Sequence, residues 1–193
     1  ENNLKFLPEH LPEGLKILWC DRNPLKSLPK LPKNLEILKC SMTTLTSLPE
    51  LPNSLKTINC SKNHLTSFPE IPECLEKLNL SYNKITILSE LSKNLKSLKC
   101  NFNDLTSLPK LPKGLKRLYC HINKLESLPK LPQNLKVLHC YRNKLESLPK
   151  LPQNLKELHC YRNKLESLQP KQGSFSLPKS LKKLHCGWNN LTK

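Results

Sequence analysis

Residues 135–154 read LKVLHCYRNKLESLPKLPQN, and the central part of this segment, LHCYRNKLESL, occurs again at residues 158–168. The spacing extends along the chain. Leucine stands at 15, 35, 55, 75, 95, 115, 135 and 155, and cysteine at 20, 40, 60, 100, 120, 140 and 160, with Leu80 in the gap. A fixed period of twenty residues predicts a stack of short structural repeats rather than an ordinary globular domain.

Each copy follows the pattern L-x-x-L-x-C-x-x-N-x-L-x-S-L-P-x-L-P-x-x. The alternation at Leu138 and Cys140 predicts a short strand with one face inward, and successive strands should stack in parallel about 4.8 Å apart. The recurrent asparagine, such as Asn143, should bond backbone groups left unpaired where the chain leaves the strand; Thr43 replaces it once. The paired Leu-Pro units fix φ and remove amide donors, so the return segment is predicted to be extended and polyproline-like.

The fold class predicted for residues 1–193 is therefore a single solenoid of about nine repeats, formally of the α/β repeat class but practically all-β. Each turn has one short parallel strand. The last repeat carries a six-residue excess, residues 169–174, which is expected to be an insertion loop on the return side because it lacks the Leu-Pro pairing. The array begins and ends within a repeat, so the chain is expected to be part of something longer.

The first part of the pattern is the leucine-rich repeat signature, and the paired Leu-Pro units at Leu48–Pro52 and Leu128–Pro132 follow it. This combination resembles the short bacterial-effector type of leucine-rich repeat, as found in YopM- and IpaH-like effectors and in similar arrays of giant viruses and amoeba-associated bacteria. The resemblance implies a scaffold whose variable surface positions define the partner. The N-terminal helical hairpin and the catalytic ligase domain of such effectors are not visible in the sequence.

Eight of the nine cysteines occupy the inward strand position, which Leu80 also fills. A position that accepts leucine requires a small apolar group rather than a thiol, so the ladder cysteines are expected to be reduced and structural. Reduced thiols favour a cytoplasmic location, in the host if the protein is a secreted effector. Cys140 and His139 point to opposite faces of one strand, which excludes them as a nucleophile and base and predicts that the chain is not an enzyme.

Three columns of residues beside the ladder cysteine are expected to lie on or beside the concave inner face. The predicted partner-binding residues, most of them from these columns, are Arg117, Tyr119, His121, His139, Tyr141, Arg142, His159, Tyr161, Arg162, His185 and Trp188. Tyrosine, tryptophan and arginine are enriched in recognition surfaces. Adjacent histidines on parallel strands can share an ion, but nothing else nearby offers the closed tetrahedral set of a structural zinc site, so neither a metal site nor a cofactor is predicted.

Charge separates the two halves of the chain. Residues 1–96 contain 13 Lys and Arg against 10 Asp and Glu, a net of +3, whereas residues 97–193 contain 19 against 5, a net of +14. We therefore predict a non-enzymatic protein-interaction scaffold whose concave C-terminal half binds an acidic or anionic protein partner, with affinity that rises on mild acidification as unperturbed histidines titrate near pH 6.5.

Several alternatives stay open from the sequence. The resemblance allows a host-directed effector, or the substrate-recognition domain of a ubiquitin-ligase effector that lacks its catalytic domain here. Nucleic acid could bind basic ridges formed by Lys110, Lys130 and Lys150 or by Lys124, Lys144 and Lys164. The repeated surface could also be solvated residues copied by duplication. No apolar run is long enough to span a membrane, and no membrane partner is predicted.

Overall fold

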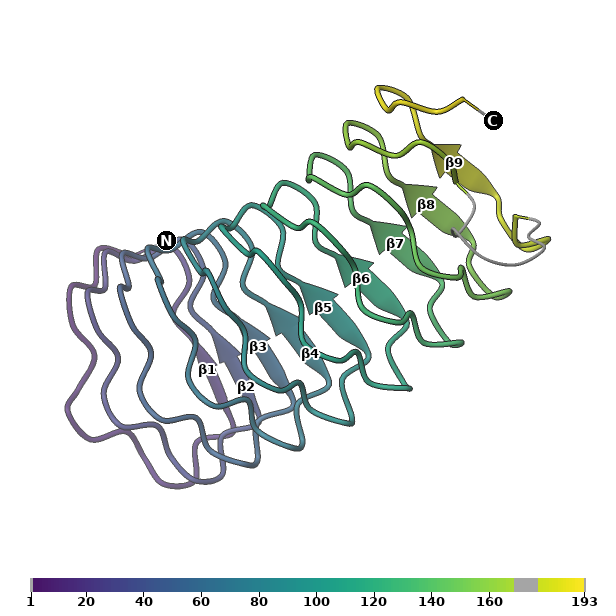
Figure 1. Cartoon of the computed structure of the whole chain (residues 1–193). Coiled ribbons are helices and arrows are strands. Elements are labelled where there is room, and N and C mark those ends of the chain that lie inside the picture. Colours follow the sequence, from purple (N-terminus) through teal and green to yellow (C-terminus); the bar gives the residue numbers. More distant parts are fainter. Residues whose placement is uncertain (1, 169–176, 193) are drawn as a thin grey trace.

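The computed structural model describes residues 2–168 and 177–192, in which the turns stack in sequence order into one elongated solenoid (Figure 1). The strands are β1 (Ile17–Trp19), β2 (Ile37–Lys39), β3 (Thr57–Asn59), β4 (Lys77–Asn79), β5 (Ser97–Lys99), β6 (Arg117–Tyr119), β7 (Val137–His139), β8 (Glu157–His159) and β9 (Lys183–His185). They form one parallel sheet in the order β1 to β9. The predicted fold class, a leucine-rich-repeat solenoid with one short strand per turn, is confirmed.

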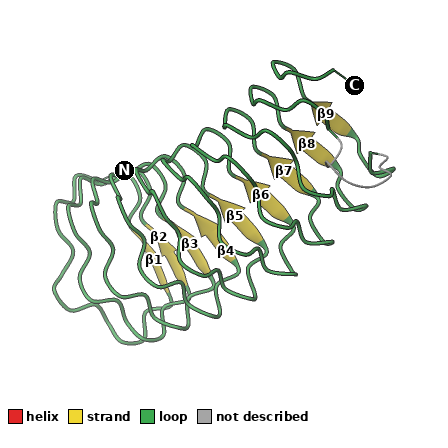
Figure 2. Ribbon diagram, in the orientation of Figure 1, coloured by secondary structure: helices red, strands yellow, loops and turns green. Residues whose placement is uncertain are grey.

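The register follows the sequence period. Leu138 pairs with Leu158, one period later, and Leu158 pairs with Leu184 across the longer last turn. The predicted insertion at residues 169–174 lies outside the described residues. The return segments are extended, and Figure 2 shows only strands and loops, so the described residues contain no helix that could cross a membrane.

The core is a stack of leucines and cysteines inside the turns. Leu135, Leu138, Cys140 and Leu145 of one repeat are fully buried, and the same positions are buried in the turns on either side. Leu80 has no exposed surface at the cysteine position, so a larger apolar group fits where the other repeats have a thiol. Because each turn buries its apolar residues only against its neighbours, the interior repeats as the sequence does.

The recurrent asparagine holds adjacent turns together, as predicted. Asn143 donates from Nδ2 to the carbonyl oxygens of Cys120 and Cys140, at 3.1 and 3.0 Å. Its Oδ1 accepts a hydrogen bond from the Leu125 amide at 3.0 Å. One side chain therefore satisfies three backbone groups that would otherwise be buried without partners. At the exceptional position, the Thr43 hydroxyl bonds the Cys40 carbonyl at 3.1 Å and also reaches Asn63 Oδ1.

The inward position that Cys140 and Leu80 occupy in their repeats is called the ladder position. The residue two places after it has a left-handed backbone in all nine turns. These residues, with φ between 49 and 58°, are Arg22, Met42, Lys62, Tyr82, Phe102, Ile122, Arg142, Arg162 and Trp188. This conformation costs a non-glycine residue about 1 kcal/mol or more, but it aims the amide at the next turn, as when Arg142 N donates to Tyr161 O at 3.0 Å. Because all nine turns share it, the strain belongs to the fold and not to a binding site.

Candidate functional site

The outward face of the sheet carries the residues predicted to bind a partner, and we call it the sheet face. It consists of the first and third residues of each strand and the two residues that follow the ladder position. The third residues of β6, β7, β8 and β9 are in register with one another, and we call this column the histidine ladder. It contains Tyr119, His139, His159 and His185. The His139 and His159 rings stack at 4.1 Å and 8°, and His159 stacks on His185 at 4.2 Å and 9°.

A second row of rings runs beside the first, formed by residues one or two places after the ladder position, and we call it the aromatic ladder. Its members are Tyr82, Phe102, His121, Tyr141, Tyr161 and Trp188. The ring centroids of Tyr82 and Phe102 lie 4.0 Å apart, those of His121 and Tyr141 4.3 Å, and those of Tyr141 and Tyr161 4.3 Å, all stacked. Such contacts stabilise by about 0.5–1.5 kcal/mol each beyond burial, so the rings hold one another in place.

Two members of the aromatic ladder, Tyr82 and Phe102, were missed by the sequence reasoning. Both occupy the left-handed position, the same column as Arg142. Aligning the repeats by the twenty-residue period would have placed them beside the predicted residues. The ladder thus extends two turns further toward the N-terminus than predicted.

His121 differs from the prediction that it is displayed to a partner. It is only 8% exposed. Its ring stacks on that of Tyr141 and makes an edge contact with that of Phe102, at a centroid distance of 5.8 Å. Burial, followed by the nearby His139 and His159, lowers the pKa of His121 from 6.5 to about 4. Its ring is therefore neutral at mildly acidic pH and cannot strengthen the binding of an acidic partner there.

The same correction applies to part of the histidine ladder. Burial lowers the pKa of His159, and the positive charges that His139 and His185 would carry lower it further. The lowered pKa of His159 opposes the gain of charge at this residue on which the predicted acid-strengthened binding depends. The main physical reason is burial of the ring between adjacent turns, which the sequence does not reveal.

Glu157 lies against two members of the histidine ladder. Its Oε1 is 2.9 Å from His139 Nε2 and 3.3 Å from His159 Nε2. The hydrogen bond from His139 is the main cause that lowers the pKa of Glu157. The structure thus adds one carboxylate to the two histidines, and the three donor atoms lie within 4.8 Å of one another.

The predicted arginines flank the ladders. Arg117, Arg142 and Arg162 are exposed, and the Arg162 guanidinium lies 5.0 Å from the centre of the exposed Trp188 ring. Burial and the neighbouring Tyr161 raise the pKa of Tyr141 to about 12, so its hydroxyl is neutral and can donate. Planar rings beside guanidinium groups offer both apolar contact and hydrogen-bond donors to carboxylates.

A shallow groove of about 440 Å³ lies on the sheet face at the N-terminal end of the ladders. Its lining residues are Ser61, Lys62, Asn79, Ser81, Tyr82, Lys99, Asn101, Tyr119, His121 and His139. Lys62 and Lys99 place their ammonium groups 5.7 and 5.4 Å from the ring centres of Tyr82 and Tyr119. The groove therefore adds two cations that the sequence reasoning did not assign to the site.

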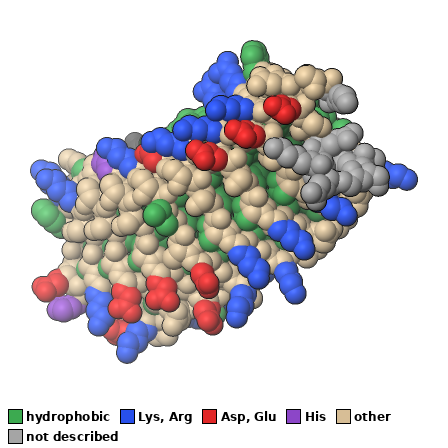
Figure 3. All heavy atoms as spheres, in the orientation of Figure 1, with side chains coloured by type: hydrophobic (Ala, Val, Ile, Leu, Met, Phe, Trp, Pro, Cys, Tyr) green, Lys and Arg blue, Asp and Glu red, His purple; other side chains and the backbone are tan. Residues whose placement is uncertain are grey.

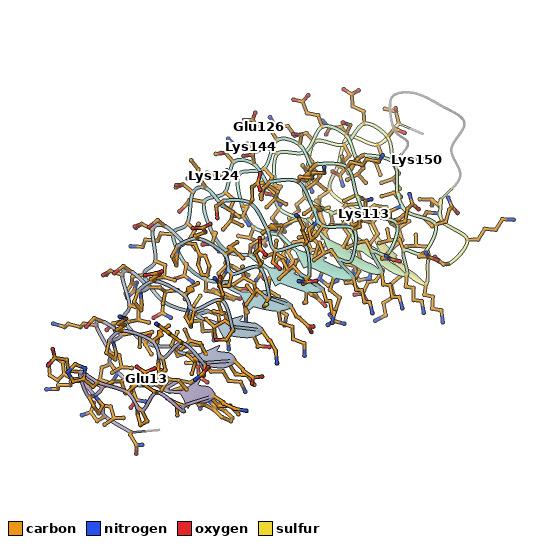
Figure 4. All side chains as sticks on the ribbon, turned by 90° about the horizontal axis from the view of Figure 1, so that it is seen from below. Glu13, Lys113, Lys124, Glu126, Lys144 and Lys150 are labelled. Atoms are coloured by element: carbon orange, nitrogen blue, oxygen red, sulfur yellow. The ribbon has the colours of Figure 1, made fainter. Side chains whose placement is uncertain are left out.

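The lysine ridges proposed for nucleic acid lie apart from one another. Lys124 and Lys144 follow one edge of the solenoid, while Lys150 lies elsewhere, near the last turns (Figure 4). Lys124 pairs with Asp104 of the preceding turn at 2.7 Å. Figure 3 shows Lys and Arg along the lower edge of the C-terminal half, with Asp and Glu gathered below the N-terminal half.

The seven buried cysteines of the ladder are poor nucleophiles at neutral pH. All nine cysteines are free; seven are buried, Cys186 is half-buried and Cys74 is exposed. Burial raises the pKa of Cys60 and of Cys100 to about 12. Since the thiolate is the nucleophile, these buried groups act as core residues.

Comparison with known proteins agrees with this architecture. A Leucine Rich Repeat family model matches residues 74–93. YopM from Yersinia enterocolitica WA-314 is 38% identical with a TM-score of 0.93, and the match covers 98% of this chain but 41% of YopM. A Shigella effector LRR domain is 33% identical over 81% of this chain and 63% of its own, with a TM-score of 0.57. No curated protein sequence matches the chain.

A third solved structure bears on the cysteines. The functional domain of InlJ from Listeria monocytogenes, described as including a cysteine ladder, is 25% identical with a TM-score of 0.74, over the whole of this chain and 48% of InlJ. Fold, repeat pattern and matches together define a leucine-rich repeat protein. Within that class the chain has the short repeats of YopM-like effectors, and it spans less than half the length of YopM.

Proposed function

We propose that this chain is a non-enzymatic protein-interaction module whose C-terminal sheet face binds an acidic protein partner. The observation that carries the proposal is the alignment of two ring ladders with exposed arginines on one open face. Residues 97–193 also hold most of the excess positive charge. Rings already fixed by stacking lose little conformational freedom on binding, which favours affinity.

The charge distribution supports an anionic partner in particular. Beyond residue 96 the sequence has only five acidic residues, and one of these, Glu157, is engaged with histidines. Among the described residues, the groove lysines and Arg117, Arg142 and Arg162 form no ion pair with a carboxylate. A partner that brings its own carboxylates or phosphates would complete these pairs, and association would weaken with added salt.

The test uses an acidic peptide selected from a display library against the purified chain, with affinity read by fluorescence anisotropy. The sheet-face variant combines Tyr141→Ala, Arg142→Ala, Tyr161→Ala and Arg162→Ala. We expect it to weaken binding by at least about 30-fold, the equivalent of one interface hot spot. The matched change on the return side, Lys130→Ala with Lys150→Ala, should alter affinity by less than about threefold, as solvated surface charges do.

The opposite pattern would contradict the proposal. If the return-side variant abolishes binding while the sheet-face variant binds normally, the sheet face is not the site. A single-stranded oligonucleotide that binds the chain more tightly than any acidic peptide, with a steep salt dependence, would favour the nucleic-acid alternative.

Similarity to YopM and to a Shigella effector LRR domain supports a host-directed effector as the setting of this binding. The reduced cysteines are consistent with a cytoplasmic location, in the host if the protein is secreted. A second candidate, substrate recognition within a larger ubiquitin-ligase effector, uses the same surface and requires a catalytic domain outside this sequence. The complete reading frame distinguishes the two, because only the second requires such a domain.

A further inference from the structure

The cluster of His139, Glu157 and His159 combines three donor atoms in a geometry that hydrogen bonding leaves incomplete. Both histidine Nε2 atoms approach the same carboxylate oxygen, at 2.9 and 3.3 Å. Only the His139 contact has hydrogen-bond geometry. His159 Nε2 is inaccessible to solvent and has no hydrogen-bond partner among the described residues, which is costly for a buried polar atom.

The three side chains are shielded and pre-positioned. They are 16%, 23% and 16% exposed, in the order His139, Glu157 and His159. Ring stacking with His185 supports His159 from the far side. The site therefore does not need to be assembled from mobile surface residues, and the ordering cost of binding a ligand is reduced.

A metal ion would give His159 Nε2 the partner that it lacks and would replace the hydrogen bond between His139 and Glu157. Two imidazole nitrogens and one carboxylate oxygen form a donor set that zinc accepts, with bonds of about 2.0–2.2 Å, whereas calcium and magnesium prefer oxygen alone. In a tetrahedral site with such bonds, neighbouring ligand atoms lie about 3.3 Å apart. The distances from Glu157 Oε1 to the Nε2 atoms of His139 and His159, 2.9 and 3.3 Å, are close to this ligand-to-ligand distance.

We propose that His139, Glu157 and His159 bind a divalent transition-metal ion, with Zn²⁺ the best match. Because the stacked imidazoles are parallel to within 8°, binding requires a small rotation of the two rings toward each other. Three protein ligands leave the fourth position open, and on this face it can take water or a side chain of a bound molecule. The proposal does not depend on the nature of the protein partner.

The nearest competing charge is Lys183, whose ammonium lies 3.9 Å from Glu157 Oε2. That side chain is 66% exposed, so it can move into solvent when a cation binds. The oxygen it approaches is not the one that faces the histidines. Lys183 therefore weakens the site without blocking it.

Within the described part of the chain the cluster occurs once, because the first residue of the strand differs between repeats. Val137 is the register partner of Glu157 on β7, and Lys183 is its partner on β9. Of the nine strands, only β8 begins with an acidic residue, whose carboxylate reaches the histidines of β7 and β8. Glu157→Val gives residues 155–168 the sequence of residues 135–148, so this variant should fold as the preceding turn does.

The test titrates Zn²⁺ into the full chain, purified without a histidine tag, by calorimetry, and repeats the titration with Co²⁺ to read the coordination from its visible absorption. We expect one ion per chain, the absorption bands of a four-coordinate site, and an increase in melting temperature. Glu157→Val should weaken Zn²⁺ binding by at least about 10–100-fold, the loss found even for outer-shell changes, and should abolish the Co²⁺ bands.

Two further variants separate geometry from charge. The exchange Val137→Glu with Glu157→Val keeps composition and charge but moves the acid to the turn between Tyr119 and His139, so it should bind as weakly as Glu157→Val. Glu126→Gln, a change of an exposed acid elsewhere, should bind as the original does. Equal Zn²⁺ affinity of the original chain, Glu157→Val and the exchange variant would overturn the proposal.

Discussion

The N-terminal and C-terminal halves of the sheet face rest on the same interior but present different chemistry. In the first turns, short polar groups bond one another: Ser41 Oγ donates to Asp21 at 2.7 Å, and Ser61 Oγ to Asn59 at 2.9 Å. In the later turns, stacked rings occupy the same columns. Beneath both, the leucine and cysteine positions are buried alike.

Charge pairing differs in the same direction. Glu36 bonds Lys56 at 2.6 Å and Glu76 bonds Lys96 at 2.7 Å, both in the first half. The second half has too few acids to balance its lysines and arginines in this way. A repeat scaffold can therefore keep the same stabilising contacts in every turn while its surface changes, since each turn is held by its buried residues and by the hydrogen bonds of its asparagine.

The largest expected effect is on stability, and it should be equal in the two halves. Asn63→Ala and Asn143→Ala each remove hydrogen bonds to three backbone groups, at 2.9–3.0 Å and 3.0–3.1 Å respectively. We expect each to lower the free energy of unfolding by about 2–4 kcal/mol, because the groups stay buried without partners. Urea denaturation followed by circular dichroism measures it. A large loss in one half and none in the other would show that the scaffold is not uniform.

The next effect sharpens the difference between the halves through pH. The folded pKa of His121, about 4, lies below its unfolded value near 6.5. The unfolded chain therefore takes up the proton first, and stability falls as pH decreases from about 6.5 to 4, by up to about 2–3 kcal/mol from this residue.

His121→Tyr should remove that part of the acid sensitivity, because tyrosine takes up no proton between pH 7 and 4. Tyrosine should fit this position, since Tyr141 and Tyr161 occupy it in the next two turns. Unfolding by urea at pH 7 and at pH 4.5, with a chelator present, measures the change. The control, His64→Tyr at an exposed position, should leave the pH dependence as it is. The same acid sensitivity in His121→Tyr as in the original chain would contradict the assigned role.

A smaller effect is expected at the cysteine ladder. Cys140→Ala and Cys160→Ala should each cost about 1–2 kcal/mol through lost packing, and Cys60→Ala in the other half should cost the same. Folded Cys140→Ala and Cys160→Ala should bind the acidic peptide with unchanged affinity. Loss of binding in a fully folded cysteine variant would mean that the thiols do more than pack.

The sequence predicted the fold because one period determined strand, turn and return segment together. Leu138, Cys140 and Asn143 have the burial and hydrogen bonds expected of them. The left-handed position escaped prediction, because none of its nine residues is glycine.

The site was predicted less completely. The columns and their registers followed from the period, so Tyr119, His139 and His159 lie in line as expected. Burial of His121 depends on ring stacking between turns, which spacing does not reveal. The contact of Glu157 with two histidines was not predicted, because Glu157 stands where the preceding repeat has valine and so belongs to no pattern that the repeats share.

The most direct test of the central claim, that recognition is confined to the C-terminal sheet face, compares two matched variants in one binding assay. The C-terminal variant combines Tyr141→Ala, Arg142→Ala and Tyr161→Ala; the N-terminal variant combines Trp19→Ala, Lys39→Ala and Met42→Ala, also on the sheet face. We predict that affinity for the selected acidic peptide falls at least about 30-fold in the first and stays within about threefold in the second. Equal losses, or a larger loss in the N-terminal variant, would contradict the claim.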